Sequence, residues 1–239
     1  MKGKLSPEKA ILLVGGKGTR LRPLTDKLPK ALLDVNGKTV TEHLLDLFKK
    51  YGINDIILSV GYLKDKIIEY FNCGNKFGVT IAYIKEDEPL GTAGPLLIAR
   101  KYLNKSFIVA NGDELKKIDI YQMYGFHKKN NAVVTIALTK VEEPSHYGVA
   151  KLVGNKIGEF VEKPKKENAP SNLVNAGFYI MEPEVIDLIK PGFSMLEKDV
   201  FPLLARQGKL YGFSFEGQWF DVGTLERYEL AKRMWEDIL

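Results

Sequence analysis

The feature that most constrains the fold of this chain is the alternation of strand-like and helical segments over its first 140 residues. Apolar strand-like runs cover residues 10–14, 56–60, 79–84, 107–110 and 132–138. Segments with helical periodicity lie between most of them, at residues 40–51, 63–71, 93–102 and 121–129. Strands that alternate with helices at this spacing are typical of right-handed crossovers and parallel sheets. We therefore predict an α/β fold with three layers, α/β/α, around a mostly parallel central sheet.

The second half of the chain has a different pattern. Strand-like residues 149–153 and 157–161 are separated by Gly154-Asn155, which is a hairpin signal. We then expect a strand at 175–181, helices near 183–189 and 197–207, a strand at 210–215 and a last helix at 225–238. These segments predict antiparallel additions to the sheet, within one domain that spans residues 1–239.

Composition narrows the possible functions. The net charge is +5, but the 35 basic residues are scattered among 30 acidic ones, so we expect no binding to nucleic acid. No apolar run approaches the ~20 residues that span a bilayer, and the N-terminus lacks an apolar signal core, so we expect a cytoplasmic protein without membrane contact. Cys73 is the only cysteine, which excludes an internal disulfide, and the three histidines lack metal-ligand spacing.

A glycine-rich, basic segment follows the first expected strand. It runs from Gly15 to Lys30 and reads GGKGTRLRPLTDKLPK, directly after the apolar ILLV. Glycines let backbone N–H groups approach an anion closely, so phosphate is the expected ligand. The segment does not fit the phosphate loop of ATPases, and Leu21 stands where the dinucleotide fingerprint needs its third glycine.

A second polar motif ends another strand. Asp113 comes directly after the buried run at 107–110, as the glycine loop does after the run at 10–14. In parallel sheets, ligands bind beyond the carboxyl ends of the strands. We therefore expect the loop and Asp113 to lie at the same edge of the sheet.

These motifs together resemble the sugar-1-phosphate nucleotidyltransferase family, whose signature is GGxGTRLxPLTxxxPK. The resemblance continues through five further segments, PLGTAG at 89–94, NGD at 111–113, EKP at 162–164, NAG at 175–177 and DVGT at 221–224. The segment PLGTAGPL is similar to the mannose-1-phosphate guanylyltransferase branch. No tail of hexapeptide turns follows, so we expect the short form without the C-terminal β-helix of longer relatives. The resemblance implies a Rossmann-like fold, with residues 1–140 mainly binding nucleotide and 141–239 mainly binding sugar phosphate.

The resemblance also implies an activity and its residues. The family joins a nucleoside triphosphate to a sugar 1-phosphate by in-line attack on the α-phosphorus and releases pyrophosphate, so alignment and charge neutralisation dominate the catalysis. Arg20, Lys30 and Asp113 are the implied catalytic residues; Arg20 faces the leaving phosphates and Lys30 the reacting phosphate. The implied nucleotide-binding residues are Leu13, Gly15, Gly16, Gly18, Thr19, Glu86, Gly91 and Thr92.

Two aspartates form the candidate metal site. Asp113 and Asp221 each end an apolar segment, so their carboxylates could converge. Mg²⁺ prefers oxygen ligands and is usually bound by one or two carboxylates together with substrate phosphates. We therefore expect Mg²⁺ as the cofactor, held by Asp113 and Asp221.

The implied sugar-phosphate residues lie in the second half of the chain. Lys163 holds the phosphate in the family, and Asn175 offers a donor and an acceptor to sugar hydroxyls. The full expected set is Gly148, Glu162, Lys163, Asn175, Gly177 and Glu197. Glu197 opens a helical stretch, so stabilisation of a helix N-terminus explains it almost equally well.

The position of Glu86 bears on the choice of base, because the family reads the base edge there. A carboxylate only accepts hydrogen bonds. Guanine presents N1–H and N2–H₂ side by side, uracil and thymine present one N3–H between carbonyls, and adenine N1 is an acceptor. We therefore expect GTP, and the resemblance to the guanylyltransferase branch implies mannose 1-phosphate as the favoured sugar. The alternatives are a UTP- or dTTP-dependent transferase for glucose or amino-sugar 1-phosphates, and a non-catalytic regulatory subunit that binds nucleotide sugar. The expected partners are small molecules, and the chain can form a homo-oligomer.

Overall fold

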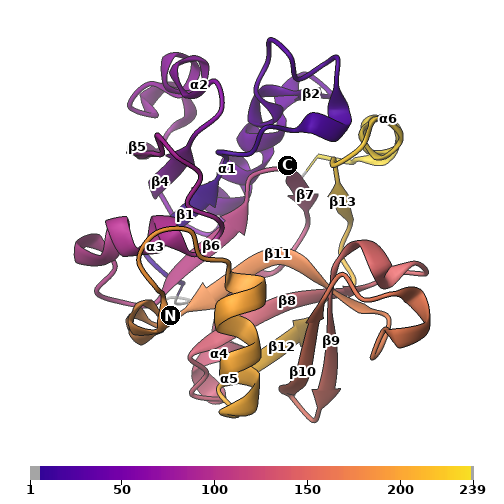
Figure 1. Ribbon diagram of the computed structural model, residues 1–239. Coiled ribbons are helices and arrows are strands. Elements are labelled where there is room, and N and C mark those ends of the chain that lie inside the picture. Colours follow the sequence, from indigo (N-terminus) through magenta and orange to yellow (C-terminus); the bar gives the residue numbers. More distant parts are fainter. Residues whose placement is uncertain (1–5, 238–239) are drawn as a thin grey trace. The chain divides into compact units, whose positions relative to one another are not determined.

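The chain passes back and forth between two structural units. The computed structural model describes residues 6–237. One unit, here called the loop unit because it contains the glycine loop, comprises Glu8–Pro89, Ala110–Ile118 and the chain from Gly217 onward. The other, the hairpin unit, is built mainly from Leu90–Val109 and Asp119–Glu216. Strand β6 (Phe107–Asn111) contains one of the crossing points. Figure 1 shows the elements of both units.

Three parallel strands form the sheet of the loop unit. They are β1 (Lys9–Leu13), β4 (Asp55–Val60) and β5 (Thr80–Lys85), with β4 between the other two. Ile56, Leu58 and Val60 are fully buried, as expected for a strand that is covered on its faces. The register pairs Leu13 with Ser59, so the glycine loop leaves β1 at the carboxyl end of the sheet.

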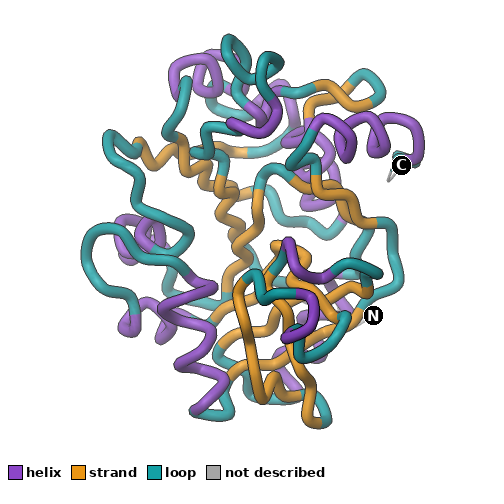
Figure 2. Tube along the Cα trace, turned by 45° about the vertical axis from the view of Figure 1, so that its right-hand side comes forward, coloured by secondary structure: helices purple, strands orange, loops and turns teal. Residues whose placement is uncertain are grey.

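Two helices and two short strands accompany this sheet. Helix α1 (Val40–Lys50) begins with a capping box, in which Thr39 and Glu42 exchange side-chain-to-backbone hydrogen bonds of 3.2 and 2.6 Å. Helix α2 (Lys64–Phe71) connects β4 to β5. Strands β2 (Asp34–Val35) and β3 (Lys38–Thr39) form a small hairpin before α1. Loops and 3₁₀ turns, the latter at Thr19–Leu21, Lys30–Leu32 and Asn75–Phe77, complete the connections (loops teal in Figure 2).

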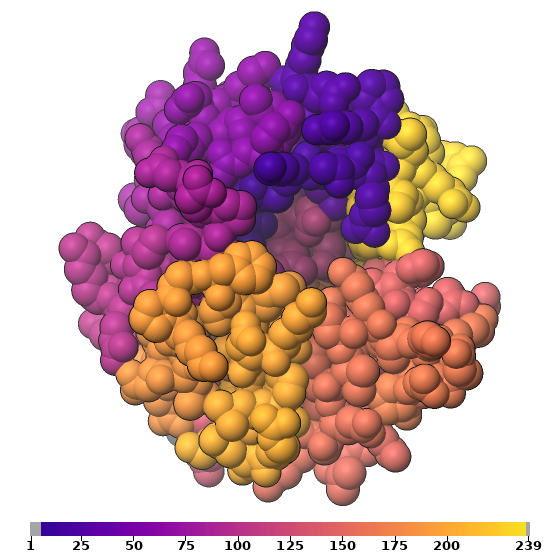
Figure 3. Space-filling view, viewed as in Figure 1, coloured from indigo at the N-terminus to yellow at the C-terminus, as the bar shows by residue number. Residues whose placement is uncertain are grey.

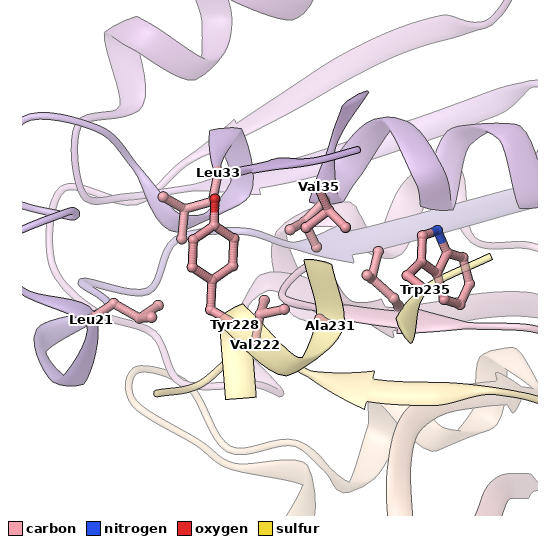
Figure 4. Packing of buried hydrophobic residues seen from close by; sticks show 9 residues of the cluster. Leu21, Leu33, Val35, Val222, Tyr228, Ala231 and Trp235 are labelled. Atoms are coloured by element: carbon pink, nitrogen blue, oxygen red, sulfur yellow. The ribbon is translucent and has the colours of Figure 1, made fainter. Parts of the chain in front are cut away.

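The C-terminal part of the chain packs against the N-terminal part within the loop unit. Strand β13 (Trp219–Asp221) pairs antiparallel with β7 (Glu114–Lys116), and α6 (Leu225–Met234) follows. Figure 3 shows this yellow segment directly against the indigo N-terminal residues. The interface is the apolar cluster of Figure 4, formed by Leu21, Leu33, Val35, Val40, Leu115, Val222, Tyr228, Ala231 and Trp235. This cluster fixes β7 and β13 beside the glycine loop.

The hairpin unit contains a mixed sheet. Its strands are β8 (Val134–Lys140), β9 (Gly148–Val153), β10 (Lys156–Glu162), β11 (Leu173–Met181) and β12 (Leu210–Ser214). β12 runs parallel to β8, whereas β11 pairs antiparallel with β8 and β10 pairs antiparallel with β9 and β12. β11 also pairs with β9 through Val174 and Val149.

Short helices pack on this sheet. α4 (Ile120–Lys129) contacts β8, β11 and β12, and α5 (Phe201–Arg206) contacts β10 and β12. α3 (Gly94–Ala99) continues into a 3₁₀ turn at Arg100–Tyr102. Further 3₁₀ turns lie at Pro144–His146, Lys166–Asn168 and Pro183–Leu188, and a π-helical turn at Leu196–Val200 precedes α5.

The expected α/β class is confirmed, with parallel strands in the first half and antiparallel additions in the second. Two expected helices are wrong in type or extent. Residues 183–188 form a 3₁₀ helix that ends as Ile189 turns to extended geometry. Residues 197–207 divide between Val200 and Phe201 into a π turn and α5, and Pro202 lies in the first turn of α5, where its missing N–H is tolerated.

The last helix ends at Met234, four residues before the expected end, because Trp235 leaves helical geometry and packs in the apolar cluster. Residue 238 of that expectation lies outside the described residues. Between residues 6 and 237, no helix has the length and apolarity needed to cross a bilayer.

Candidate functional site

The glycine loop folds back on itself in the loop unit. Gly18 has φ +61°, and a Cβ there would lie 3.0 Å from Thr25 and 3.4 Å from Lys30, so a larger residue would be both strained and crowded. The buried Thr25 hydroxyl donates to the Gly18 carbonyl at 2.8 Å. Gly16, Thr19 and Arg20 are exposed, and nothing lies within 4 Å of a Cβ built on Gly16. The loop therefore offers open backbone and the exposed guanidinium of Arg20 to a ligand, whereas the exposed Arg22 is paired with Asp26 at 3.2 Å.

Lys30 and Asp113 meet at the end of this loop. The Lys30 side chain is 10% exposed, and its Nζ contacts Asp113 Oδ2 at 2.6 Å. Burial raises the pKa of the Asp113 carboxyl, but the charge of Lys30 and its hydrogen bond hold that pKa below the ordinary value. Asp113 is therefore an anion that faces a buried cation.

Close packing of the backbone puts Asp113 there. The Gly112 N–H donates to the Leu13 carbonyl at 3.0 Å, which joins the ends of β6 and β1. A Cβ on Gly112 would lie 2.2 Å from Val14, so only glycine fits. This contact confirms that the glycine loop and Asp113 leave the sheet at one edge.

Asp221 lies next to Asp113 through the β7–β13 ladder. The Val222 N–H donates to the Asp113 carbonyl at 3.2 Å, and Asp221 pairs with Glu114. Arg227 from α6 contacts Asp221 Oδ2 at 2.7 Å. A Cβ on Gly223 would lie 2.7 Å from Asp221 Oδ1 and 3.1 Å from Arg20 Nη2, so Gly223 allows Arg20 to approach Asp221.

A buried ionic network supports these two aspartates, and sequence reasoning missed it. Glu114 accepts hydrogen bonds from Asn111 at 3.0 Å and Trp219 at 2.7 Å, and lies 3.3 Å from Lys116 Nζ. Burial raises the pKa of Glu114, and it lowers the pKa of Lys116. The three residues ELK of β7 are too few to show a pattern, so the sequence did not indicate that Glu114 and Lys116 are buried.

Glu86 lies against the start of the glycine loop. Its Oε1 accepts a 2.6 Å hydrogen bond from Ser59, and its N–H donates to the Val60 carbonyl at 2.8 Å. A Cβ on Gly15 would lie 3.2 Å from Glu86 Oε1. The structure therefore brings Glu86 and Gly15 together, as expected for two residues of one nucleotide site.

The hairpin unit contains a second group of candidate residues. The Thr92 hydroxyl donates to Glu197 Oε2 at 2.6 Å and accepts from the Leu196 N–H at 2.9 Å. Gly91 has φ +74°, and a Cβ there would lie 2.3 Å from the Ser194 carbonyl. Burial raises the pKa of Glu197 despite the Thr92 hydrogen bond. Thr92, expected at the nucleotide, thus contacts a residue expected at the sugar.

Glu162 and Lys163 lie close to this group. Gly148 pairs with Glu162 in the β9–β10 ladder, and a Cβ on Gly148 would lie 2.9 Å from Glu162 Oε2. The charges of Glu162 and Lys163 both act on the Glu197 carboxyl. Lys163 has φ +49°, which is unusual for a residue with a large side chain, and its side chain is 62% exposed, with Nζ 3.5 Å from Glu162 Oε1. An exposed cation on a strained backbone position is typical of a binding residue rather than a packing residue.

Asn175 and Gly177 stand in an irregular part of β11. The Asn175 side chain accepts from the Gly177 N–H at 2.9 Å and donates to the Tyr179 hydroxyl at 2.8 Å. An amide has two donors and two lone pairs, so each of its ends keeps capacity for one more hydrogen bond. The role of Asn175 at a sugar stays a prediction.

The donor chemistry of the aspartate pair fits Mg²⁺. Asp113 and Asp221 supply carboxylate oxygens from neighbouring backbone positions, and the ion pairs with Lys30 and Arg227 use only Oδ2 of each. Within residues 6–237, no group of three or more His, Cys, Asp and Glu side chains could hold a metal by itself. The pair therefore suits an ion that takes its other ligands from substrate and water.

Comparison with known proteins agrees with this geometry. The Nucleotidyl transferase family model matches residues 9–237. The chain is 46% identical over 221 residues to a mannose-1-phosphate guanyltransferase of Yarrowia lipolytica, covering 90% of this chain and 60% of that protein. The chain thus spans about three fifths of that relative's length.

Solved structures share the fold. A putative glucose-1-phosphate thymidylyltransferase from Bacillus anthracis has a TM-score of 0.88 at 27% identity, with 97% of this chain and 96% of that chain covered. HddC from Yersinia pseudotuberculosis, complexed with GMP-PN, has a TM-score of 0.81 at 27% identity, covering 96% of this chain and all of that one. The fold is Rossmann-like, and the chain belongs to the nucleotidyl transferase family.

Proposed function

We propose that this protein is a sugar-1-phosphate nucleotidyltransferase that forms GDP-mannose and pyrophosphate from GTP and mannose 1-phosphate. The main structural support for nucleotidyl transfer is the contact of buried Lys30 with Asp113 beside an open glycine loop. The similarity to mannose-1-phosphate guanyltransferases supports the choice of substrates. The proposed partners are these small molecules. Cytoplasmic location, homo-oligomerisation and the lack of nucleic-acid binding stay predictions.

The loop unit holds the nucleotide in this proposal. Backbone groups of Leu13, Gly15, Gly16, Gly18 and Thr19 bind the nucleoside and its phosphates. Arg20 is exposed and its guanidinium can bind two phosphate oxygens at once, which suits the departing pyrophosphate. The Glu86 carboxylate accepts the N1–H and N2–H₂ donors of guanine.

Charge neutralisation at the reacting phosphate falls to Lys30. A single ammonium can follow the charge as it moves from the attacked phosphorus to the leaving group. Its buried position beside Asp113 fixes the ammonium before substrate binds, so little reorganisation is needed during the reaction. Asp113 and Asp221 would hold Mg²⁺, which when bound would supply further positive charge to the phosphates.

The hairpin unit holds the sugar phosphate. Lys163 presents its exposed ammonium to the phosphate, and Glu162, Glu197 and Asn175 contact sugar hydroxyls. Gly148 and Gly177 leave room for the backbone to approach the ring. Thr92 holds Glu197 in place through its hydroxyl. The expected contact of Gly91 and Thr92 with the nucleotide stays a prediction.

The direct test is a grid of four nucleoside triphosphates against mannose, glucose and N-acetylglucosamine 1-phosphates, with and without Mg²⁺, read as pyrophosphate release. We expect the highest kcat/KM with GTP and mannose 1-phosphate, and none without the ion. A preference for UTP or dTTP would assign the alternative transferase activity. Nucleotide-sugar binding without turnover in any combination would assign the regulatory role.

A further inference from the structure

A buried polar side chain outside the predicted site contacts the proposed base-reading residue. Ser59 lies in β4 and is fully buried. Its hydroxyl is 2.6 Å from Glu86 Oε1. A carboxylate only accepts hydrogen bonds, so Ser59 is the donor. This contact could not be read from the sequence, because the two residues are 27 positions apart and the segment between them contains all of α2 and β5.

Strand register places this contact at the edge of the sheet that carries the glycine loop. Ser59 pairs with Leu13, the last residue of β1, and with Ile84 of β5, two residues before Glu86. The Val14 N–H donates to the Ser59 carbonyl at 2.9 Å. The backbone at Ser59 is therefore held by hydrogen-bonded strands on both sides, which fixes the position from which its side chain extends.

The Glu86 carboxylate lies between the Ser59 hydroxyl and the backbone of Gly15, where a Cβ would lie 3.2 Å from Oε1. Glutamate has several rotatable bonds, and a free side chain loses rotamer freedom when a ligand immobilises it. With the Ser59 hydrogen bond already made, part of that cost is removed before nucleotide binds.

Base discrimination requires this orientation. Guanine needs two acceptors side by side, which both oxygens of one carboxylate supply. Uracil directs two carbonyl oxygens toward the same region, and a carboxylate fixed there repels them. A carboxylate that could rotate away would bind guanine less tightly and would exclude uracil less strictly.

We propose that Ser59 is a positioning residue for base selection, whose hydroxyl holds the Glu86 carboxylate in the orientation that favours guanine over uracil. This inference rests on the proposed function. It concerns a residue that does not touch substrate and acts only through Glu86. Ser59 therefore controls selectivity among nucleotides and leaves the chemical step unchanged.

The test compares Ser59→Ala with the wild type for GTP and UTP. We expect kcat/KM for GTP to fall about tenfold, since a hydrogen bond to a charged group is lost. KM for GTP should rise while kcat stays nearly unchanged, because base contacts are made equally in the ground and transition states. UTP should be used equally well or better, so the GTP-to-UTP ratio falls by at least tenfold. Calorimetric titration with GDP and UDP should give the same change in relative affinity without turnover.

Two further variants separate positioning from a general structural effect. In a Glu86→Ala background, Ser59→Ala should change the GTP-to-UTP ratio less than twofold, because the carboxylate through which Ser59 acts is absent. Thr41→Val is the matched control: it removes a hydroxyl in α1 that is equally buried and, among residues 6–237, has no hydrogen-bond partner. It should leave the ratio at the wild-type value.

The outcomes distinguish this inference from the proposed function. If the wild type prefers GTP and Ser59→Ala keeps the ratio within twofold, the role of Ser59 is wrong and the proposed function stands. An equal loss for GTP and UTP would also overturn it, since that is the result of a structural defect. If the wild type does not prefer GTP, both fail. Should Ser59→Ala not fold, Ser59→Cys, which keeps the volume with a weaker donor, should give a smaller fall in the same direction.

Discussion

The loss of stability when the Lys30–Asp113 ion pair is broken should depend on which of the two charged residues is replaced. The two charged groups are 2.6 Å apart, but their exposures differ: 10% for the Lys30 side chain and 42% for Asp113. At an effective dielectric constant of about 20, the gross attraction is about 6 kcal/mol, most of which is offset by the desolvation of the ammonium. The net cost of a substitution therefore depends on the charge that remains.

Lys30→Met leaves a carboxylate that water can reach. We expect the free energy of unfolding to fall by about 1 kcal/mol, in the range of a partly exposed ion pair. Asp113→Asn leaves a buried ammonium with a neutral partner. The asparagine oxygen still accepts a hydrogen bond, and the repulsion between residue 113 and Glu114 is relieved. We therefore expect the free energy of unfolding to fall by about 2 to 3 kcal/mol, at the low end for an unpaired buried charge.

Urea unfolding at neutral pH and low salt measures both values, with circular dichroism as the signal. The control is Lys64→Met, which removes an ion pair of 2.5 Å to Asp87, whose side chain is 91% exposed; no measurable change is expected. Pyrophosphate release should fall at least about 100-fold in both variants, since Lys30→Met removes a positive charge at the phosphates and Asp113→Asn removes a proposed Mg²⁺ ligand. A Lys30→Met protein that is less stable than Asp113→Asn would refute the argument from burial.

Three further predictions concern other parts of the chain. Glu86→Gln should lower kcat/KM for GTP by about 100-fold or more, because Ser59 would still donate to the remaining oxygen and turn the amide N–H₂ toward the donors of guanine. Activity with UTP should not fall. An equal loss for GTP and UTP in steady-state kinetics would contradict this. Thr41→Val should raise the free energy of unfolding by about 1 kcal/mol, since it replaces an unpaired buried hydroxyl with a methyl group; a lower melting temperature would show that the hydroxyl is satisfied. Burial lowers the pKa of His127, and hydrogen bonds from Lys128, Ser106 and His127 outweigh burial and lower the pKa of Glu182. A depressed folded pKa gives stability that is present above the unfolded pKa and lost below it, so this pair should contribute less stability as pH falls from 7 to 4. In urea unfolding, Glu182→Gln should therefore destabilise the protein more at pH 7 than at pH 4, and an equal effect at both pH values would be the contrary result.

Much of the fold could be predicted because its longer elements have strong periodicity. Strands β1 and β4 have buried, mostly apolar interiors, and α1 has both a capping box and a buried apolar face, so local sequence and burial agree. The β7–β13 pair could not be predicted. Each strand has three residues, too few for a period, and they are more than 100 residues apart in the sequence.

The candidate site shows a similar division. Backbone features such as Gly18 and Gly91 could be predicted, since each adopts positive φ where a side chain would clash. Contacts between distant side chains could not, as the Ser59–Glu86 and Thr92–Glu197 hydrogen bonds show. Such pairs depend on strand register and on loops whose geometry is set by tertiary packing.

The division of binding between the two halves of the chain stays a prediction. The units are interleaved in sequence, since residues 110–118 and those from 217 onward belong with the N-terminal part. Asp221, from the second half, accordingly lies beside Asp113 and Arg20. The chain's sequence order is thus a poor guide to which unit holds a given residue.

The most direct test of the central claim is the product formed from GTP and mannose 1-phosphate in the presence of Mg²⁺, identified by mass spectrometry alongside pyrophosphate release. The account predicts GDP-mannose and pyrophosphate in equal amounts, with Lys30→Met nearly inactive and Lys64→Met unchanged. Wild-type protein that releases no pyrophosphate from GTP, or that releases it from UTP at a higher kcat/KM, would contradict the proposed guanylyltransferase activity.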